Sequence, residues 1–517
     1  MEEIDVPGGS ILLDGWVKEP VSSIDPRSSD PVTGVYNYIF LDDKVDTITI
    51  KNDSLGQRPL YFTVGPGRVV VGTVFWDVAK KAKKSSADIC YESIRQLRLY
   101  RRLTPPSRTL LEGVFLLPAG SKLEIFDRGA NYKLTQSLTM KQDPDHGIDE
   151  VVAAHQLDKA IHKTFEYIKG VCGPSDVWFG NSGGLDSRLI PAYAERVGLP
   201  VKGYIVSEAR PRGFLSQSEL SSDLVSKHFN LENKKINFDE GDPWGRLIRD
   251  IHVNPFGPAN FHKNAGFEGF HGDIILTGGN SFVIANDNNA WRDLAEIDGD
   301  PVENYARKIF FRGFSSECDD KDYISNLKEC IQVAIPNGDN FSSFRTLHQL
   351  YLNKTSPAGA FESMSMAGEF QYIYHPFITE ESKRWPEHIF YDRKVQSALF
   401  EGFFPELLSF PDQSGKVWRN DGQKLGRFAR VKSKIRLKVR TDGLNYPRWL
   451  ASSWYRGLMK LVECEVSRSQ SGLPSELLRE ASIHKRAQDS VDLVKLAIMV
   501  RYLEAGDFSL GGNRDAG

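Results

Sequence analysis

Hydrophobic and polar positions in the first part of the chain follow short runs that favour strands. Runs rich in β-branched and aromatic residues end at small groups of Asn, Asp, Gly and Pro, which form turns. This pattern predicts strands at 35–41, 47–50, 60–64, 68–73 and 121–126, and helices at 76–84 and 93–101. Residues 1–140 are therefore expected to form a sheet-rich α+β domain, followed by a polar linker at 141–147.

The pattern changes at about residue 150, where helices and strands begin to alternate. Apolar residues at helical spacing predict an amphipathic helix over 150–169. Strands are predicted at 176–179, 201–206, 235–238 and 273–276, with one helix ending at 197 and another at 218–229. Such alternation implies βαβ units and a parallel sheet. Beyond about residue 320 the chain is expected to be mostly helical, so the second domain would span 150–517.

The string SGGLDS, which begins at Ser182, lies between a predicted strand and a predicted helix. Gly183 and Gly184 allow a tight turn whose N–H groups face one concavity at the start of the helix, a geometry that binds phosphate. Ser187 adds a second hydroxyl donor, and Asp186 is expected to ligate Mg²⁺. The alternative is a turn that only caps the helix, with an ordinary first-turn acid. The strand–loop–helix context favours the phosphate site.

The string resembles the pyrophosphate loop of ATP-pyrophosphatase enzymes, specifically that of the asparagine synthetase-like family. Residues 52–62 resemble that family's D-x-x-G-x-x-P-L-Y-Y segment, and residues 108–121 resemble its T-L-F-x-G-I-x-x-L-P-P-G stretch. Parts of 365–377 resemble its S-M-A and P-F-L-D region. The resemblance implies an α+β Ntn-hydrolase-like sandwich domain, then an α/β PP-loop synthetase domain with a parallel sheet and a mostly helical C-terminal part.

The same resemblance implies a ligase that adenylates a carboxylate with Mg-ATP, releases pyrophosphate and forms an amide with an amine or ammonia. Family members that hydrolyse glutamine have a Cys nucleophile after the initiator Met, whereas this chain has Glu2. We therefore expect a degenerate class II amidotransferase domain and no glutamine hydrolysis. The substrate could be a small acid, a sugar carboxylate of surface-polysaccharide synthesis, or a peptide, as in natural-product biosynthesis and the lasso-peptide cyclases.

A second metal motif of the family, S-G-x-G-x-D, is altered here. Thr277 and Gly278 match it, but no carboxylate stands at Asn280 or Phe282, and Asp287 is the nearest acid that could replace it. An amide offers Mg²⁺ less charge compensation than a carboxylate does. Weaker metal binding is therefore expected, and an ATP-binding scaffold without catalysis stays open as an alternative.

Three further residues are candidates for roles in the reaction. Lys416 stands where the family has a loop lysine that stabilises the adenylation transition state, or else is an exposed lysine of a Pro/Gly loop. Glu369 either orients the attacking amine or caps a helix. Val206 ends a predicted strand and offers its backbone to adenine, because ligands bind at the carboxyl ends of parallel strands.

Composition and charge narrow the partners and the location. Lys and Arg total 65 and Asp and Glu total 68, a net charge of −3, so no global field attracts nucleic acid. Residues 430–440 alternate cations with mostly apolar residues; they form either a solvated face or a contact with an anionic surface such as a lipid leaflet. The 5 Cys residues are scattered, the N-terminus lacks a signal peptide, and no apolar run reaches about 18 residues. A cytoplasmic protein is therefore expected.

Overall fold

The computed structural model describes most of the first 237 residues and separate parts of the remainder. The described residues are 2–6, 9–17, 21, 24–27, 34–42, 45–53, 56–100, 103, 105, 107–136, 147–171, 177–207, 217–237, 243–253, 255–256, 272–278, 298–300, 303–304, 321, 324–326, 328, 370–374, 376–377, 379, 381–390, 394–411, 457, 459–460, 473–483 and 487–506. The predicted linker lies outside these ranges apart from residue 147.

The N-terminal part contains a six-stranded antiparallel sheet with the strand order β1-β2-β3-β4-β8-β9. Its strands are β1 (Glu2–Val6), β2 (Gly9–Val17), β3 (Gly34–Asp42), β4 (Ile48–Asn52), β8 (Ser121–Phe126) and β9 (Asn131–Gln136). The strands predicted at 35–41, 47–50 and 121–126 are confirmed. The sequence pattern did not predict β1, β2 or β9.

A second antiparallel sheet, with the order β6-β5-β7, packs against the first. Its strands are β5 (Tyr61–Gly65), β6 (Arg68–Gly72) and the short β7 (Phe115–Leu116). Ile50 and Leu123 of the larger sheet share one apolar cluster with Phe62 of the smaller sheet. Strand β8 is buried at every second residue, as expected for a strand with one face on a core. Helices α1 (Phe75–Lys81) and α2 (Tyr91–Tyr100) follow the smaller sheet's hairpin and confirm the two predicted helices.

The middle of the chain forms a five-stranded sheet in which every neighbouring pair is parallel, with the order β12-β11-β10-β13-β14. Its strands are β10 (Val177–Gly180), β11 (Lys202–Ser207), β12 (Asn233–Asn237), β13 (Gly272–Leu276) and β14 (Phe370–Tyr374). The first four confirm the predicted strands and the parallel sheet. Strand β14 lies in the segment predicted to be mostly helical, so that segment also contributes a strand to the sheet.

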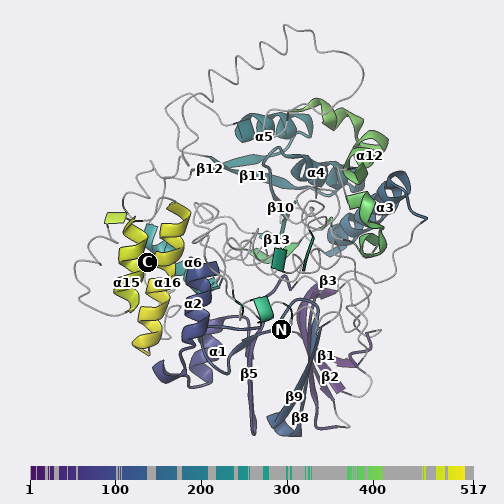
Figure 1. The fold of residues 1–517 in the computed structure, drawn as a ribbon. Helices are drawn as coiled ribbons and strands as arrows, with labels where there is room; N and C mark the ends of the chain where they lie inside the picture. The colour runs from purple at the N-terminus through teal and green to yellow at the C-terminus, as the bar shows by residue number, and fades with distance from the viewer. Residues whose placement is uncertain are drawn as a thin grey trace.

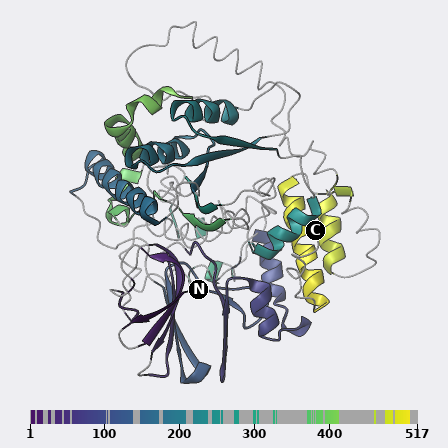
Figure 2. The same cartoon turned by 180° about the vertical axis from the view of Figure 1, so that it is seen from behind.

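Helices cover both faces of the parallel sheet (Figures 1 and 2). Val177 and Phe179 of β10 join one apolar cluster, and Trp178 between them joins another, because successive strand residues point to opposite faces. The first cluster includes residues of α3 (Glu150–Val171), α4 (Leu185–Val197) and α12 (Lys394–Phe403). The second includes residues of α6 (Pro243–Val253), α15 (Leu473–Ile483) and α16 (Ala487–Glu504). The remaining described helices are α5 (Gln217–His228) and short 3₁₀ turns, among them η8 (Glu381–Arg384), η9 (Glu387–Phe390) and η10 (Pro405–Ser409).

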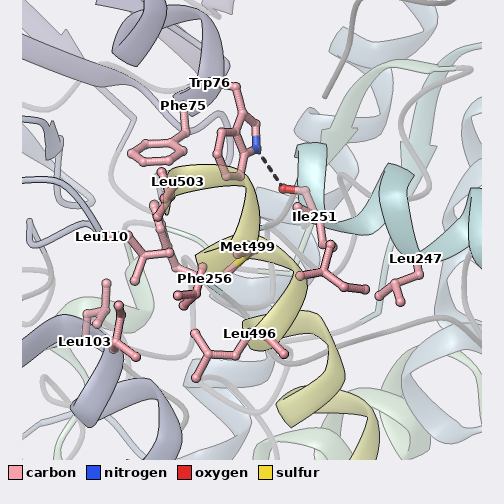
Figure 3. Packing of buried hydrophobic residues seen from close by; sticks show 14 of the residues in the cluster. Phe75, Trp76, Leu103, Leu110, Leu247, Ile251, Phe256, Leu496, Met499 and Leu503 are labelled. Carbon is pink, nitrogen blue, oxygen red and sulfur yellow. Dashed lines mark hydrogen bonds between the residues drawn. The ribbon is translucent and has the colours of Figure 1, made fainter. Parts of the chain in front are cut away.

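The second cluster also joins the N-terminal and C-terminal parts of the chain into one core. Figure 3 shows Phe75 and Trp76 of α1 beside Met499 and Leu503 of α16. The Trp76 indole N–H donates a hydrogen bond to the backbone oxygen of Ile251 on α6, at 3.1 Å. The smaller N-terminal sheet and α1 are therefore bound to the later helices through a continuous apolar contact.

A buried ion pair lies within these later helices. The Lys495 ammonium on α16 is 2.7 Å from the carboxylate of Asp250 on α6, and the two side chains are 3% and 0% exposed. An unpaired charge at this depth would be costly, so the two residues depend on each other. None of the described helices is long and apolar enough to cross a membrane.

Candidate functional site

The string SGGLDS folds as a loop between β10 and α4, at the carboxyl end of the sheet's central strand. Gly183 has a φ of +67°, and a Cβ atom there would lie 2.4 Å from both the Cβ and the Oγ atom of Ser221 on α5. Only glycine meets both conditions without strain. Gly184 precedes the helix in an extended conformation and provides no side-chain cap. No side chain of the N-cap residue therefore accepts a hydrogen bond from the backbone N–H groups at the start of α4.

The two serines of the string are tied together across the loop. Ser182 Oγ donates to Ser187 Oγ at 3.2 Å, and Ser187 Oγ donates to the Gly184 oxygen at 3.0 Å. The Gly184 N–H donates to Ser182 Oγ at 3.3 Å. Ser182 and Asp186 are partly exposed, whereas the other residues of the string are buried. These hydrogen bonds hold the two hydroxyls at fixed positions in the loop.

A buried asparagine anchors the beginning of this loop. The Asn181 N–H donates to the Tyr204 backbone oxygen on β11 at 2.7 Å, and its side-chain Nδ2 donates to Ser226 Oγ on α5 at 2.8 Å. Tyr204 lies alongside Gly180, and its burial raises the pKa of its hydroxyl above the usual range, so the group stays protonated. These contacts fix the exit of β10 relative to its neighbours.

The turn after β13 lies directly against the start of α4. A Cβ atom on Gly278 would lie 3.1 Å from Asp186 Cβ and 3.3 Å from the Ser187 nitrogen. The Thr277 N–H donates to the Tyr374 oxygen at 3.0 Å, which fixes the turn to β14. The structure therefore brings together Asp186 and the Thr277-Gly278 turn, two features that the sequence places about 90 residues apart.

A glutamine from a distant helix contacts the acid of the loop. Gln396, on α12, donates from Nε2 to Asp186 Oδ1 at 2.6 Å, and its side chain is 2% exposed. Its Oε1 atom is buried and has no hydrogen-bond partner. One oxygen of the carboxylate is thus held by an amide donor, and a buried acceptor lies beside it.

A buried arginine connects the loop to the segment after η10. The Arg188 guanidinium, 0% exposed, donates to the backbone oxygens of Leu407 at 2.7 Å and Pro411 at 3.0 Å, and also to that of Gly183. Ser221 Oγ donates to the same Gly183 and Pro411 oxygens. Pro411 is therefore fixed against the loop from two helices, and Lys416 follows it by five residues in the sequence.

The other predicted site residues fall into two groups. Val206 lies on β11, paired with Ile236 of β12, near the carboxyl end of the strand as predicted. Lys416, Glu369, Asp287 and the basic segment 430–440 lie outside the described residues. Among the residues that are described, no three His, Cys, Asp or Glu side chains gather as a metal cluster. Asp186 is thus the acid that the described loop offers to a cation.

Three polar contacts of the site were not predicted from the sequence: those of Gln396, Arg188 and Ser221. For Gln396 and Arg188 the sequence does contain a feature that indicates a buried polar side chain. Gln396 lies three and four residues before the buried Leu399 and Phe400, so it occupies the apolar face of its helix. Arg188 likewise lies among buried residues on both sides in α4. A long polar side chain on an apolar helix face indicates a buried partner, although it does not identify that partner.

Two comparisons of this chain's sequence with known proteins give no match. No protein-family profile matches its sequence. A search of curated protein sequences likewise gives no match. The site must therefore be interpreted from its own residues.

Proposed function

We propose that this protein is an ATP-dependent, amide-forming ligase. In the proposed reaction a substrate carboxylate oxygen attacks the α-phosphorus of ATP and pyrophosphate leaves. An amine or ammonia then attacks the acyl carbon, AMP leaves with the electrons of the broken carbon–oxygen bond, and the new amide nitrogen loses a proton. The observation that supports this best is the SGGLDS loop at the carboxyl end of β10, with Gly278 packed on Asp186.

The donor set of the loop fits a magnesium pyrophosphate. Ser182 and Ser187 provide hydroxyls, and the first turn of α4 provides N–H groups. Glycine at 183 and 278 lets the backbone lie close against Ser221 and Asp186, where a Cβ atom would collide. Asp186 would hold the cation. A single carboxylate is enough for Mg²⁺, because this ion commonly keeps several waters and binds few protein carboxylates. When bound, Mg²⁺ would neutralise charge on the departing pyrophosphate.

The chain's own residues would orient the reactants. The N-terminus of α4 would stabilise the phosphates through its backbone dipole, and Val206 would offer backbone groups to the adenine at the end of β11. Arg188 and Ser221 would hold Pro411, and with it the approach of Lys416, at a fixed position relative to the phosphates. Rate enhancement of this kind rests on positioning and on electrostatic stabilisation.

We further propose that the two antiparallel sheets form an Ntn-hydrolase-like domain without glutaminase activity, and that the parallel sheet belongs to a PP-loop synthetase domain. Strand β1 begins at Glu2, so no thiol stands at the position that the family uses for its nucleophile. Cys90 is buried, and its pKa is raised by this burial and by a hydrogen bond with Glu112, so it is a poor thiolate. The amine would then come from the substrate or from free ammonia.

The test combines pyrophosphate exchange with nucleotide binding. The purified protein should exchange pyrophosphate into ATP in the presence of its carboxylate, for which small acids, uronic-acid sugars and peptides form the panel. Asp186→Asn should weaken Mg-ATP binding measured by calorimetry, whereas Asp223→Asn, which changes an exposed acid of α5 paired with Lys235, should not. Equal affinity in both variants would contradict the role of Asp186. Tight Mg-ATP binding with neither exchange nor AMP would instead support a non-catalytic scaffold.

Glutamine hydrolysis offers a separate test of the N-terminal part. We expect no glutamate release when the protein is incubated with glutamine, with or without Mg-ATP. Release that disappears when Cys90 is replaced by Ser would show that the N-terminal part is an active glutaminase after all.

A further inference from the structure

We propose that Gln396 is a positioning residue for the metal. Its Nε2 orients Asp186, and its Oε1 accepts a hydrogen bond from a water of the hydrated cation. This inference rests on the proposed function, because it concerns the cation at the same loop. Helix α12, which lies more than two hundred residues after the loop in the sequence, would then help to hold the nucleotide.

The orientation of the Gln396 amide follows from the chemistry of its neighbour. An ionised carboxylate such as Asp186 only accepts hydrogen bonds, so the amide group that lies 2.6 Å from Oδ1 must be the NH₂ group. The reversed amide would place two oxygens in contact. Oε1 is therefore the atom of the amide that does not contact Oδ1, and it has no hydrogen-bond partner.

The unpartnered Oε1 atom needs an explanation, because buried polar atoms in folded proteins almost always have a partner. A purely structural role does not supply one: leucine would fill a similar volume in the apolar cluster of α12 without burying an acceptor. A donor that is supplied with the ligand does explain it. Asp186 is partly exposed, so a ligand that reaches the carboxylate also comes close to the amide beside it.

A hydrated magnesium ion supplies such a donor. Mg²⁺ in protein sites usually keeps several of its waters, and each bound water is a strong hydrogen-bond donor. A single amide can then hold the ligating carboxylate with its NH₂ group and a metal-bound water with its oxygen. Residues that act on a metal in this indirect way are often worth about 10–100-fold in metal affinity. Such support matters more here, where the Thr277-Gly278 turn has no acid at the expected place.

The test measures how Mg²⁺ changes the affinity for ATP in matched variants. Gln396→Leu removes both polar contacts. Its control is Gln96→Leu on α2, where a Gln that is 0% exposed donates to the Glu92 carboxylate at 3.0 Å, far from the loop in sequence. We expect Gln396→Leu to need about 10-fold more Mg²⁺ to reach half of the calorimetric enhancement of ATP binding. The control should need the parental concentration.

Two results would overturn the inference. The first is a Gln396→Leu protein with the same Mg²⁺ requirement as Gln96→Leu, while the parent binds Mg-ATP; the proposed function would then stand without this residue. The second is a parent that binds no Mg-ATP at all, which would remove the proposed function as well.

A second variant keeps the test decisive if Gln396→Leu fails to fold. Gln396→Glu places a second carboxylate against Asp186, so its unfolding temperature should fall without Mg²⁺ and recover when Mg²⁺ is added. A fall without recovery would show that no cation reaches the two side chains, which contradicts the proposal.

Discussion

Replacement of Gly183 by alanine tests whether the loop backbone is as tightly constrained as the structure indicates. Two separate costs are expected. A φ of +67° costs alanine about 1–2 kcal/mol, because its Cβ atom crowds the backbone in the left-handed region. The new methyl group would also lie 2.4 Å from Ser221, and forcing a methyl into a packed site adds about 1–3 kcal/mol. The sum is a loss of about 2–5 kcal/mol in the free energy of unfolding.

A matched glycine separates these two costs. Gly67, in the turn between β5 and β6, has a φ of +70° and no atom within 4 Å of its hypothetical Cβ. Gly67→Ala should therefore show only the backbone cost. The difference between the two alanine variants, about 1–3 kcal/mol, measures the contact with Ser221.

The assay is urea unfolding followed by tryptophan fluorescence, together with calorimetry of Mg-ATP binding. Gly183→Ala should also weaken nucleotide binding, while Gly67→Ala should leave it unchanged. Adding Ser221→Gly to Gly183→Ala removes the two side-chain atoms that clash, although not the Ser221 backbone carbon at 2.6 Å, and should recover part of the lost stability. If Gly183→Ala is no less stable than Gly67→Ala, the close approach of the loop to α5 is refuted.

Three further predictions concern buried polar groups. Arg188→Lys should lower the free energy of unfolding by about 2–4 kcal/mol, because an ammonium cannot reach the separate backbone oxygens that the guanidinium binds; unchanged urea unfolding would contradict this. Lys495→Met should cost about 3–5 kcal/mol by removing the cationic partner of the buried Asp250 carboxylate, and adding Asp250→Leu should restore most of it; a double variant as unstable as the single one would contradict the pairing. Tyr61→Phe should stabilise the protein by about 1 kcal/mol, because the Tyr61 hydroxyl is buried without a partner. Burial also raises the Tyr61 pKa above its usual range, so the hydroxyl ionises at about pH 10 only in the unfolded chain. The contribution of this group to stability is therefore complete below that pH and falls above it by up to about 1.4 kcal/mol per pH unit. Unfolding midpoints measured between about pH 8 and about pH 11 should depend less on pH in Tyr61→Phe than in the parent protein.

The sequence predicted those helices and strands whose own residues have a strong preference for that structure. Strands β3 to β6, β10, β11 and β13 are rich in β-branched and aromatic residues, and Gly198 ends α4 in the left-handed conformation that a glycine favours. Strand β2 was missed because three consecutive apolar residues, 11–13, interrupt its alternation. Strand β14 was missed because it stands alone within a segment that resembles helix.

The residues of the site likewise fall into those that local sequence can predict and those that it cannot. Gly183 could be recognised because a tight turn requires glycine whatever lies around it. The pairing of Gln396 with Asp186 could not, because the two residues are 210 positions apart and neither segment contains information about the other. The same holds for Arg188, whose acceptors are backbone oxygens of a segment some 220 residues away. Backbone oxygens have no residue identity, so no sequence pattern marks them.

The core shared by α1 and α16 also has a consequence for the order in which the chain acquires its structure. Part of the apolar cluster around Phe75 and Trp76 of α1 is formed by Met499 and Leu503, which the ribosome adds more than four hundred residues later. At about 5–20 residues per second, Met499 and Leu503 follow α1 after roughly 20–85 seconds, whereas Ile251 of α6, which accepts the Trp76 hydrogen bond, is made earlier. During that interval the growing chain displays an aromatic surface that chaperones recognise. A chain that ended before α16 would leave this part of the α1 surface without Met499 and Leu503.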